Sequence, residues 1–329
     1  MKHARKVLVE MSRQNQNGRL KRPLHTFSIV ARDPATGIIG VAVQSHWFSV
    51  GSDVCWAQAG VGAVATQAFA DPSYGPMGLN LMRRGKSAHE ALKKLIAEDA
   101  RESMRQVAMV DAEGRVAVHT GKQCTAYAGH KTGNGYTVQA NLMLNNKVPD
   151  AMAHKFEKAK GELADRMMAA LEAAQRVGGD IRGKQSAAML VVKAQSSDKP
   201  WADRILDLRV DDHPEPLKEL RRLLNVARSY EHANAGDTAV EVHNFKKAMK
   251  EYRLAMKLAG DNVEIAFWGA LTLATNGRIT EALPIFRRVF SADQNWVEVL
   301  KRLPKSGMIS NDDKGRNLLR RILRVASEG

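Results

Sequence analysis

The sequence is poor in cysteine and aromatic residues, and it contains no long apolar run. Two of its 329 residues are cysteines, they do not form a C-x-x-C pair, and 5% of the residues are aromatic. Two isolated cysteines build neither a disulfide framework nor a cysteine-rich zinc site, so we expect a reducing compartment, namely the cytoplasm. A membrane-spanning helix needs roughly 18 uninterrupted apolar residues. The sequence has no such run, and we expect no membrane span.

Motifs that hold metals or cofactors are missing as well. The sequence contains no H-E-x-x-H motif, no G-x-x-x-x-G-K-[ST] phosphate loop and no G-x-G-x-x-G fingerprint after a strand. It also lacks the G-x-S-x-G turn of many serine hydrolases. We therefore expect neither a metal site nor a cofactor.

Basic residues outnumber acidic ones. The 50 Lys and Arg residues and 35 Asp and Glu residues give a net charge of +15 at pH 7. Such an excess attracts polyanions, but here it is concentrated in the first 25 residues and after Lys301. Aromatic side chains, which stack on bases, are not interleaved with these basic clusters. The pattern argues against nucleic acid as the partner.

Alternating apolar and polar residues begin at Thr26 and indicate a region of β-strands. Turn sequences connect these runs, and Asp111 to Gly114 is short enough for a hairpin. Strand pairs, a helix pair and further strands, in this order, predict antiparallel sheets with segregated helices, which is an α+β fold. The predicted strands are Thr26–Arg32, Ile38–Gln44, Val61–Ala68, Gln106–Val110, Arg115–His119, Ser186–Val192 and Ile205–Val210.

Helical periodicity interrupts the strands three times. Helices are predicted over Gly75–Arg84, Ser87–Glu98 and Glu162–Val177. Ser87 with Glu90 three residues later has the pattern of a capping box. The third helix is expected to stop at Gly178 and Gly179.

The chain after Pro216 has the pattern of helices only. Small and aromatic residues recur there 34 positions apart, which is the period of tetratricopeptide repeats. In such repeats, small residues let two antiparallel helices cross closely and an aromatic ring fills the space between them. A generic helical bundle is the alternative interpretation. The pairs are Gly236 and Ala270, Ala248 and Ala282, Tyr252 and Phe286, and Ala255 and Val289.

Six blocks, in order, carry a resemblance to one family. The blocks are Thr26–Pro34, Gly60–Ala68, Asp71–Pro76, Ala128–His130, Gly178–Asp180 with Arg182–Ala187, and Leu208–Pro214. In these blocks the chain is similar to the proteins known as domain of unknown function 1028, which have an N-terminal-nucleophile-hydrolase-like fold. The resemblance implies a four-layer α/β/β/α sandwich and no established substrate. We expect a basic leader or propeptide at 1–25, this sandwich at 26–214 and an all-α tetratricopeptide-like domain at 215–329.

Thr26 is the residue that matches the nucleophile of such an enzyme. The mechanism needs a free α-amine beside the hydroxyl as a base, and an internal threonine has an amide nitrogen instead. Here Thr26 follows His25, so cleavage between them is required. A processed propeptide, an extension retained in an inactive protein and a start placed too early are the three explanations, and Thr26 as an ordinary strand residue is the structural alternative. Ser28, on the same strand face, is a second hydroxyl candidate.

Further polar residues are candidates for the remaining roles. The loop between Gly178 and Ser186 concentrates donors that are suited to an anionic intermediate or a substrate carboxylate, although a helix end followed by a solvated turn has the same composition. Gln139 and Asn141 alternate with apolar residues, so their amides share a strand face and are oxyanion donors or cross-strand partners. The candidates beside the two hydroxyls are Lys184, Gln139 and Asn141 for catalysis, and Asp180, Arg182, Ser186, Gln67 and His46 for substrate binding.

These residues lead to three functional hypotheses. The first is a hydrolase of amide or peptide bonds, acting on a small molecule or a peptide and joined to a helical module that binds a protein partner or a second copy. The second is a binding protein that keeps the same sandwich with its leader uncut. In the third, a scaffold, the helical repeats are the functional part.

Overall fold

The computed structural model describes residues 24–197, 199–260 and 262–326 of the chain. Two compact units are present, one ending at Leu220 and the other beginning at Arg221. Apart from Leu24 and His25, the predicted leader lies outside the described residues.

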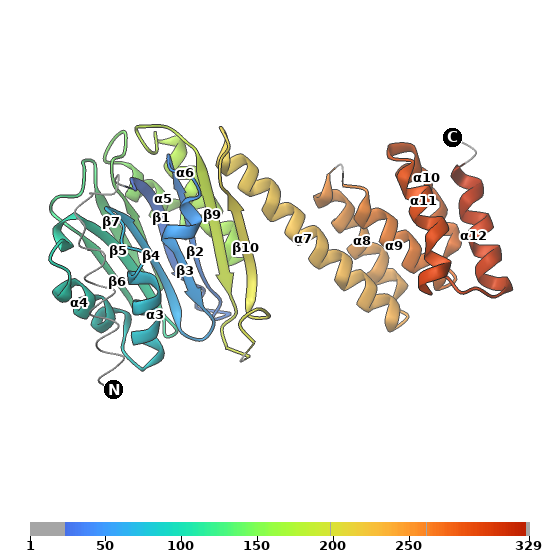
Figure 1. Cartoon of the computed structure of the whole chain (residues 1–329), viewed down its shortest axis with the longest axis horizontal. Helices are drawn as coiled ribbons and strands as arrows, with labels where there is room; N and C mark the ends of the chain where they lie inside the picture. The colour runs from blue at the N-terminus through green and yellow to red at the C-terminus, as the bar shows by residue number, and fades with distance from the viewer. Residues whose placement is uncertain (1–23, 198, 261, 327–329) are drawn as a thin grey trace. The chain divides into compact units, whose positions relative to one another are not determined.

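Two antiparallel sheets form the first unit (Figure 1). Every pair of neighbouring strands is antiparallel, as the sequence predicts. The predicted strand Thr26–Arg32 is a central strand of the larger sheet, so both of its edges are paired. The six-stranded sheet has the order β10 (Arg204–Val210), β9 (Ser186–Val192), β2 (Ile39–Ser45), β1 (Thr26–Arg32), β8 (Tyr136–Ala140) and β7 (Gly129–Gly133), and the four-stranded sheet has the order β3 (Cys55–Gln58), β4 (Gly62–Ala68), β5 (Arg105–Asp111) and β6 (Val116–Thr120).

Helices cover the outer side of each sheet. The helices α3 (Tyr74–Arg83) and α4 (Ala88–Glu98) pack on the four-stranded sheet, and α5 (Val148–Lys158) and α6 (Leu163–Arg176) pack on the six-stranded sheet (Figure 1). A short helix, α2 (Val50–Val54), lies against β9, β2 and β4. The inner faces of the two sheets contact each other. Alternation along each strand therefore sends one set of side chains toward the helices and the other set between the sheets.

The space between the sheets is apolar over most of its area. Branched residues of the six-stranded sheet meet small residues of the four-stranded sheet, which allows the two sheets to approach closely. The buried side chains that form this layer include Val30, Val41, Val43, Ala63, Ala65 and Val110.

Two local features of the sequence fix the outer helices. Ser87 Oγ accepts a hydrogen bond from the Glu90 amide at 3.2 Å, and the Glu90 carboxylate accepts one from the Ser87 amide at 2.9 Å, so the predicted capping box is confirmed. At the start of α3, a Cβ on Gly75 would lie 2.2 Å from the Trp56 ring. Only glycine permits this contact between α3 and β3.

The second unit consists of helices. They are α7 (Pro216–Glu241), which begins before the boundary between the units, α8 (Phe245–Ala259), α9 (Glu264–Thr275), α10 (Ile279–Ala292), α11 (Asn295–Arg302) and α12 (Asp313–Ala326). No helix within the described ranges is long and apolar enough to cross a membrane.

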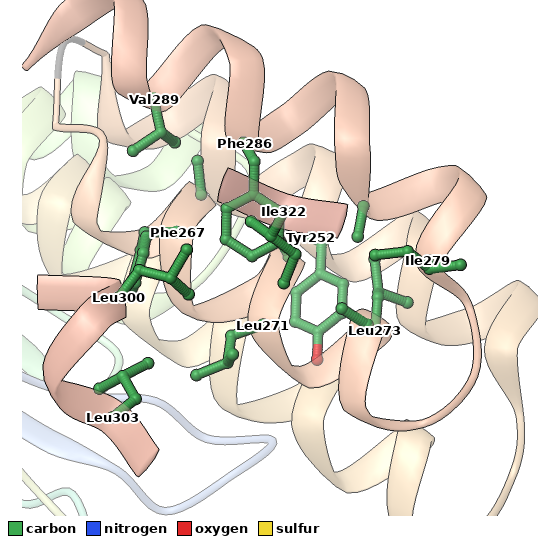
Figure 2. Close-up of a cluster of buried hydrophobic side chains, with 14 of the residues drawn as sticks. Tyr252, Phe267, Leu271, Leu273, Ile279, Phe286, Val289, Leu300, Leu303 and Ile322 are labelled. Carbon is green, nitrogen blue, oxygen red and sulfur yellow. The ribbon is translucent and has the colours of Figure 1, made fainter. Parts of the chain in front are cut away.

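Aromatic and branched side chains fill the centre of the helical unit, and Figure 2 shows them converging from several helices. Phe286 on α10 is fully buried, with its ring centroid 5.7 Å from that of Phe267 and 5.6 Å from that of Phe290. Gly236 on α7 and Gly269 on α9 both face the ring of Tyr252, where an added Cβ would lie 2.4 Å and 3.1 Å from ring atoms. Small residues thus make room for this aromatic ring.

We expect Phe286→Ala to destabilise the helical unit by about 3–5 kcal/mol, because the change removes a buried ring and leaves a cavity. Urea denaturation followed by tryptophan fluorescence, to which Trp268 and Trp296 of this unit contribute, measures the loss. Met308→Ala is the control: this side chain is 55% exposed, and its truncation should change the free energy of unfolding by less than about 0.5 kcal/mol. Equal losses in the two variants would contradict the packing described.

Candidate functional site

A cluster of buried polar side chains interrupts the apolar layer between the sheets. Thr26 and Ser28 lie on β1, on the face that β4 and β5 cover. Amide side chains from three other segments meet them, and none of these residues has any exposed surface. Ser28 lies opposite Gln139 in the register of β1 and β8, and Gln67 lies opposite Gln106 in that of β4 and β5. The cluster consists of Thr26, Ser28, Gln67, Gln106, Thr137, Gln139 and Asn141.

The Gln106 amide fixes the direction of the hydrogen bonds in this cluster. Its Nε2 lies 3.0 Å from the Ala140 carbonyl oxygen and 3.2 Å from that of Gly129, and both oxygens only accept. Its Oε1 consequently accepts from Gln67 Nε2 at 2.7 Å and from Asn141 Nδ2 at 2.9 Å. Each of these two amides therefore has a defined orientation.

The remaining bonds follow from that orientation. Gln67 Oε1 accepts from the Ser28 hydroxyl at 2.6 Å, and Ser28 Oγ accepts from Gln139 Nε2 at 2.5 Å. Gln67 Nε2 also donates to the Thr26 carbonyl oxygen at 3.2 Å. At the other end, Asn141 Oδ1 lies 2.8 Å from His25 Nδ1. Because this oxygen only accepts, the imidazole is the donor.

His25 is held as a neutral group. Burial lowers the pKa of its imidazole below the ordinary value of 6.5, against the opposing effect of the hydrogen bond to Asn141, and the Arg182 guanidinium lowers it further. A neutral imidazole with its proton on Nδ1 is therefore the form that fits this position.

Two donors converge on the carbonyl oxygen of His25, which belongs to the peptide bond before Thr26. The Ser45 hydroxyl donates to it at 2.6 Å and Arg182 Nη2 donates to it at 2.7 Å. The Thr26 hydroxyl lies 3.0 Å from the Leu24 carbonyl oxygen and 3.2 Å from Ser45 Oγ. Donors in this position polarise a carbonyl and stabilise negative charge on its oxygen when a nucleophile adds.

Asp180 orients the arginine of this donor pair. Its buried carboxylate accepts from the Arg182 amide at 2.9 Å, from Nε at 3.1 Å and from Nη2 at 2.8 Å. Gly178 and Gly179, with φ angles of 123° and 61°, end α6 and turn the chain toward this position. The two residues that the sequence places in one loop thus form an ion pair, and the arginine of that pair also reaches His25.

Three of the predicted site residues place their side chains outside both the cluster of buried polar residues and the group around the His25 carbonyl. Lys184 forms an ion pair with Glu215 and thereby lowers the pKa of that carboxylate. The Ser186 hydroxyl donates to the Trp47 carbonyl and accepts from the Val50 amide, so it holds the start of α2. The His46 side chain is exposed, and only its backbone amide reaches Asp180, at 3.2 Å.

Four residues described here were not among the predicted ones, namely His25, Ser45, Gln106 and Thr137. A sequence signal existed for two of them. Ser45 ends a strand that pairs with β1, where it lies opposite Thr26, and Gln106 alternates with the inward-facing Ala108. Nothing in the sequence indicated that the His25 side chain would be held by Asn141. Within the described parts of the chain, no three His, Cys, Asp or Glu side chains are grouped so as to hold a metal ion.

Comparisons with known proteins identify one family. The family model described as "Family of unknown function (DUF1028)" matches residues 26–220. The crystal structure of protein SPO2555 from Silicibacter pomeroyi, to which that family is also assigned, is 32% identical over 65% of this chain and 88% of its own, with a TM-score of 0.56. Anbu, an ancestral β-subunit from Yersinia bercovieri, is 10% identical over 60% of this chain and 93% of its own. The TM-score of this pair is 0.30, which is too low to indicate a shared fold. No curated protein matches the chain.

We expect Gln106→Glu to destabilise the first unit by about 3 kcal/mol or more, because a carboxylate has no proton to donate to the two backbone carbonyls. Protonation restores one donor, so the loss relative to the wild type should shrink at low pH and grow as the pH rises through the pKa of the carboxyl. Urea denaturation at several pH values measures this. Gln123→Glu is the control, since Gln123 is exposed and its Oε1 only accepts, from Ser103. A loss in the free energy of unfolding that does not change with pH and equals that of Gln123→Glu would contradict the orientation assigned to the Gln106 amide.

His25 should make the uncleaved chain less stable in mild acid. Its pKa is lowered in the folded state, so the unfolded chain takes up a proton near pH 6.5 that the folded chain does not. This contribution to the free energy of unfolding is complete above pH 6.5 and is lost as the pH falls below that value. His25→Asn keeps a donor toward Asn141 and removes the titration. Its stability should fall less between pH 7 and 5 than that of the wild type, and identical slopes would refute the assignment.

Proposed function

The chain belongs to the family of unknown function DUF1028, and we propose that it is a hydrolase of amide or peptide bonds whose nucleophile is Thr26. Cleavage of the His25–Thr26 bond activates it, and the first reaction of the protein is that cleavage. The observation that carries this proposal is the convergence of the Ser45 hydroxyl and the Arg182 guanidinium on the carbonyl that precedes Thr26.

The cleavage step uses groups that already lie together. Thr26 Oγ adds to the carbonyl carbon of His25, and its proton moves by way of the adjacent acceptors to the amide nitrogen. The negative charge develops on the oxygen that Ser45 and Arg182 contact, where preformed donors stabilise it. The C–N bond then breaks, leaving an ester between His25 and the Thr26 oxygen. Water hydrolyses this ester and releases the leader with a carboxylate at His25, together with a chain that begins with the Thr26 amine.

The released amine supplies the base for turnover. An α-amino group has a pKa of about 8, so near neutral pH part of it is unprotonated and accepts the proton from the Thr26 hydroxyl. Ser45 and Arg182 then serve as donors to the oxyanion of a substrate. The residues that we assign to this site are Thr26 as nucleophile, Ser45 and Arg182 as oxyanion donors, and Asp180 as the group that positions Arg182. Buried polar side chains support them, namely Ser28, Gln67, Gln106, Gln139 and Asn141.

Release of the leader, including residues 24 and 25, also exposes the Thr26 hydroxyl to a substrate. In the uncleaved chain the Thr26 hydroxyl is fully buried, and the Leu24 carbonyl lies 3.0 Å from it. Both residues before Thr26 are themselves almost fully buried. The buried hydroxyl also favours the second candidate, a binding protein in which the leader stays in place. The two candidates differ in whether this one peptide bond is ever broken.

The proposal includes a division of the chain. Residues 26–214 would form the four-layer α/β/β/α sandwich of N-terminal-nucleophile enzymes, supported by two facing sheets with helices outside each. Residues 215–329 would form a tetratricopeptide-like module for a protein partner or a second copy, supported by the small residues around Tyr252. Two free cysteines support a reducing compartment, the cytoplasm.

Substitutions at the nucleophile and at one of the two donors test the proposal. Thr26→Ala should abolish cleavage, and Thr26→Ser should keep it. Ser45→Ala should slow it about 10²–10³-fold, which is the usual effect of removing one oxyanion donor. The intact mass of the purified chain, followed over time, measures the rates. Ser103→Ala, which removes a hydroxyl that bonds to Gln123, is the control and should cleave at the wild-type rate. Cleavage by Thr26→Ala at the wild-type rate would exclude this mechanism.

A further inference from the structure

We infer that Leu24 and His25 occupy, in the uncleaved chain, the places that the acyl side of a substrate takes in the mature enzyme. This inference rests on the proposed function. The substrate is then an extended peptide or an acylated amide with an apolar residue two positions before the bond that is cut and a neutral hydrogen-bond donor immediately before it. Three separate sets of contacts specify these features.

Backbone contacts specify an extended chain. The Leu24 amide donates to the Ala68 carbonyl at 2.6 Å and the Ala68 amide donates to the Leu24 carbonyl at 2.9 Å, as in an antiparallel strand pair. Ala68 is the last residue of β4. When the leader leaves, this donor and this acceptor lose their partners. An incoming peptide can replace them by adding to the end of the strand, as in other cases of recognition by a sheet edge.

The Leu24 side chain specifies an apolar residue. It is 5% exposed and belongs to the apolar layer between the sheets, against which Trp47 and Ala70 also pack. Burying a leucine side chain is worth about 1.5–3 kcal/mol, whereas a carboxylate placed there would lose its hydration without gaining a partner. The site should therefore favour leucine or methionine over aspartate at this position.

The Asn141 amide specifies the residue next to the bond. Its Nδ2 donates to Gln106 Oε1, so its Oδ1 faces the His25 imidazole as a fixed acceptor at 2.8 Å. Neutral histidine, asparagine and glutamine carry a donor that matches this oxygen, and an ionised aspartate does not. The cation of Arg182 is held nearby on the His25 carbonyl, which disfavours lysine at the same position. Asparagine and aspartate have nearly the same shape, so a comparison of substrates that differ only in this residue isolates the contribution of the hydrogen-bond donor.

The experiment compares matched substrates of the mature chain. A chain that begins at Thr26 is released from an N-terminal fusion by a protease that leaves no extra residue, and circular dichroism verifies its fold. Hydrolysis is measured with three fluorogenic amides, in which acetyl-Leu-Asn, acetyl-Leu-Asp or acetyl-Asp-Asn is joined through its C-terminal carbonyl to the amine of aminomethylcoumarin. We expect kcat/KM for acetyl-Leu-Asn to exceed each of the other two at least tenfold. Hydrolysis of all three within threefold of one another would overturn the inference and leave the proposed function standing.

Binding separates the two claims when no amide is hydrolysed. The product acids acetyl-Leu-Asn and acetyl-Leu-Asp are titrated calorimetrically into the same chain with Thr26→Ala, which removes the nucleophile and keeps the other contacts. Tighter binding of acetyl-Leu-Asn by tenfold or more would uphold the inferred substrate sites while counting against catalysis by Thr26. Equal binding, or no binding of either acid at millimolar concentration, would overturn the inference.

Cleavage of the full chain provides an independent test of the apolar site for Leu24. Leu24→Met should cleave within about threefold of the wild-type rate, and Leu24→Asp should cleave at least tenfold more slowly, while both variants keep the far-ultraviolet circular dichroism of the wild type. Equal rates for Leu24→Met and Leu24→Asp would contradict the apolar site. These variants report the rate at which the His25–Thr26 bond is cleaved, whereas the fluorogenic amides report the recognition of a separate molecule.

Discussion

The carbonyl group of His25 is the point on which the site depends. A hydroxyl from β2 and a guanidinium from the loop after α6 both donate to its oxygen, and the guanidinium is held in place by Asp180. An ordinary strand carbonyl needs one partner. Two strong donors on a single oxygen, one of them charged, suit an oxygen that becomes negative during a reaction. The geometry around this one bond therefore connects the fold to the proposed chemistry.

The amide cluster explains how such a site is kept rigid inside an apolar layer. Buried amides are costly unless each donor and acceptor is satisfied, and here the backbone carbonyls of Ala140 and Gly129 set the direction of the bonds from Gln106 outward. The consequence is that Asn141 presents a fixed acceptor beside the reactive bond. The same cluster would then support both cleavage of the leader and recognition of a substrate.

Much of the fold could be predicted from the sequence, because its strongest signals are periodic. Alternation gave the bounds of β1 and β9 without error, and the capping box placed the start of α4. The strands β3 and β7 were not predicted. β3 has four residues, and β7 reads Gly-His-Lys-Thr-Gly, with three exposed side chains and no apolar alternation. Their existence depends on tertiary pairing with β4 and β8, which local pattern does not encode.

The site was predictable only in part, for a related reason. Period two places Thr26 and Ser28 on one face of their strand, and Gln139 and Asn141 on one face of theirs. In the structure these two faces lie side by side in one sheet, where Gln139 bonds to Ser28 and Asn141 bonds to His25. Lys184 shares a loop with Arg182, yet it pairs with Glu215, because a long side chain takes its nearest carboxylate and sequence does not say which one that is. Ser45 needed the strand order, which places β2 beside β1. Gln106 needed the packing of the two sheets, which brings β5 against β8 and β1.

The most direct test is N-terminal sequencing of the folded wild-type protein, purified and incubated without any other protease. The account predicts that a chain beginning Thr-Phe-Ser-Ile accumulates with time at a rate that does not depend on protein concentration, because the reaction is intramolecular. A folded chain that keeps its original N-terminus throughout would contradict the account.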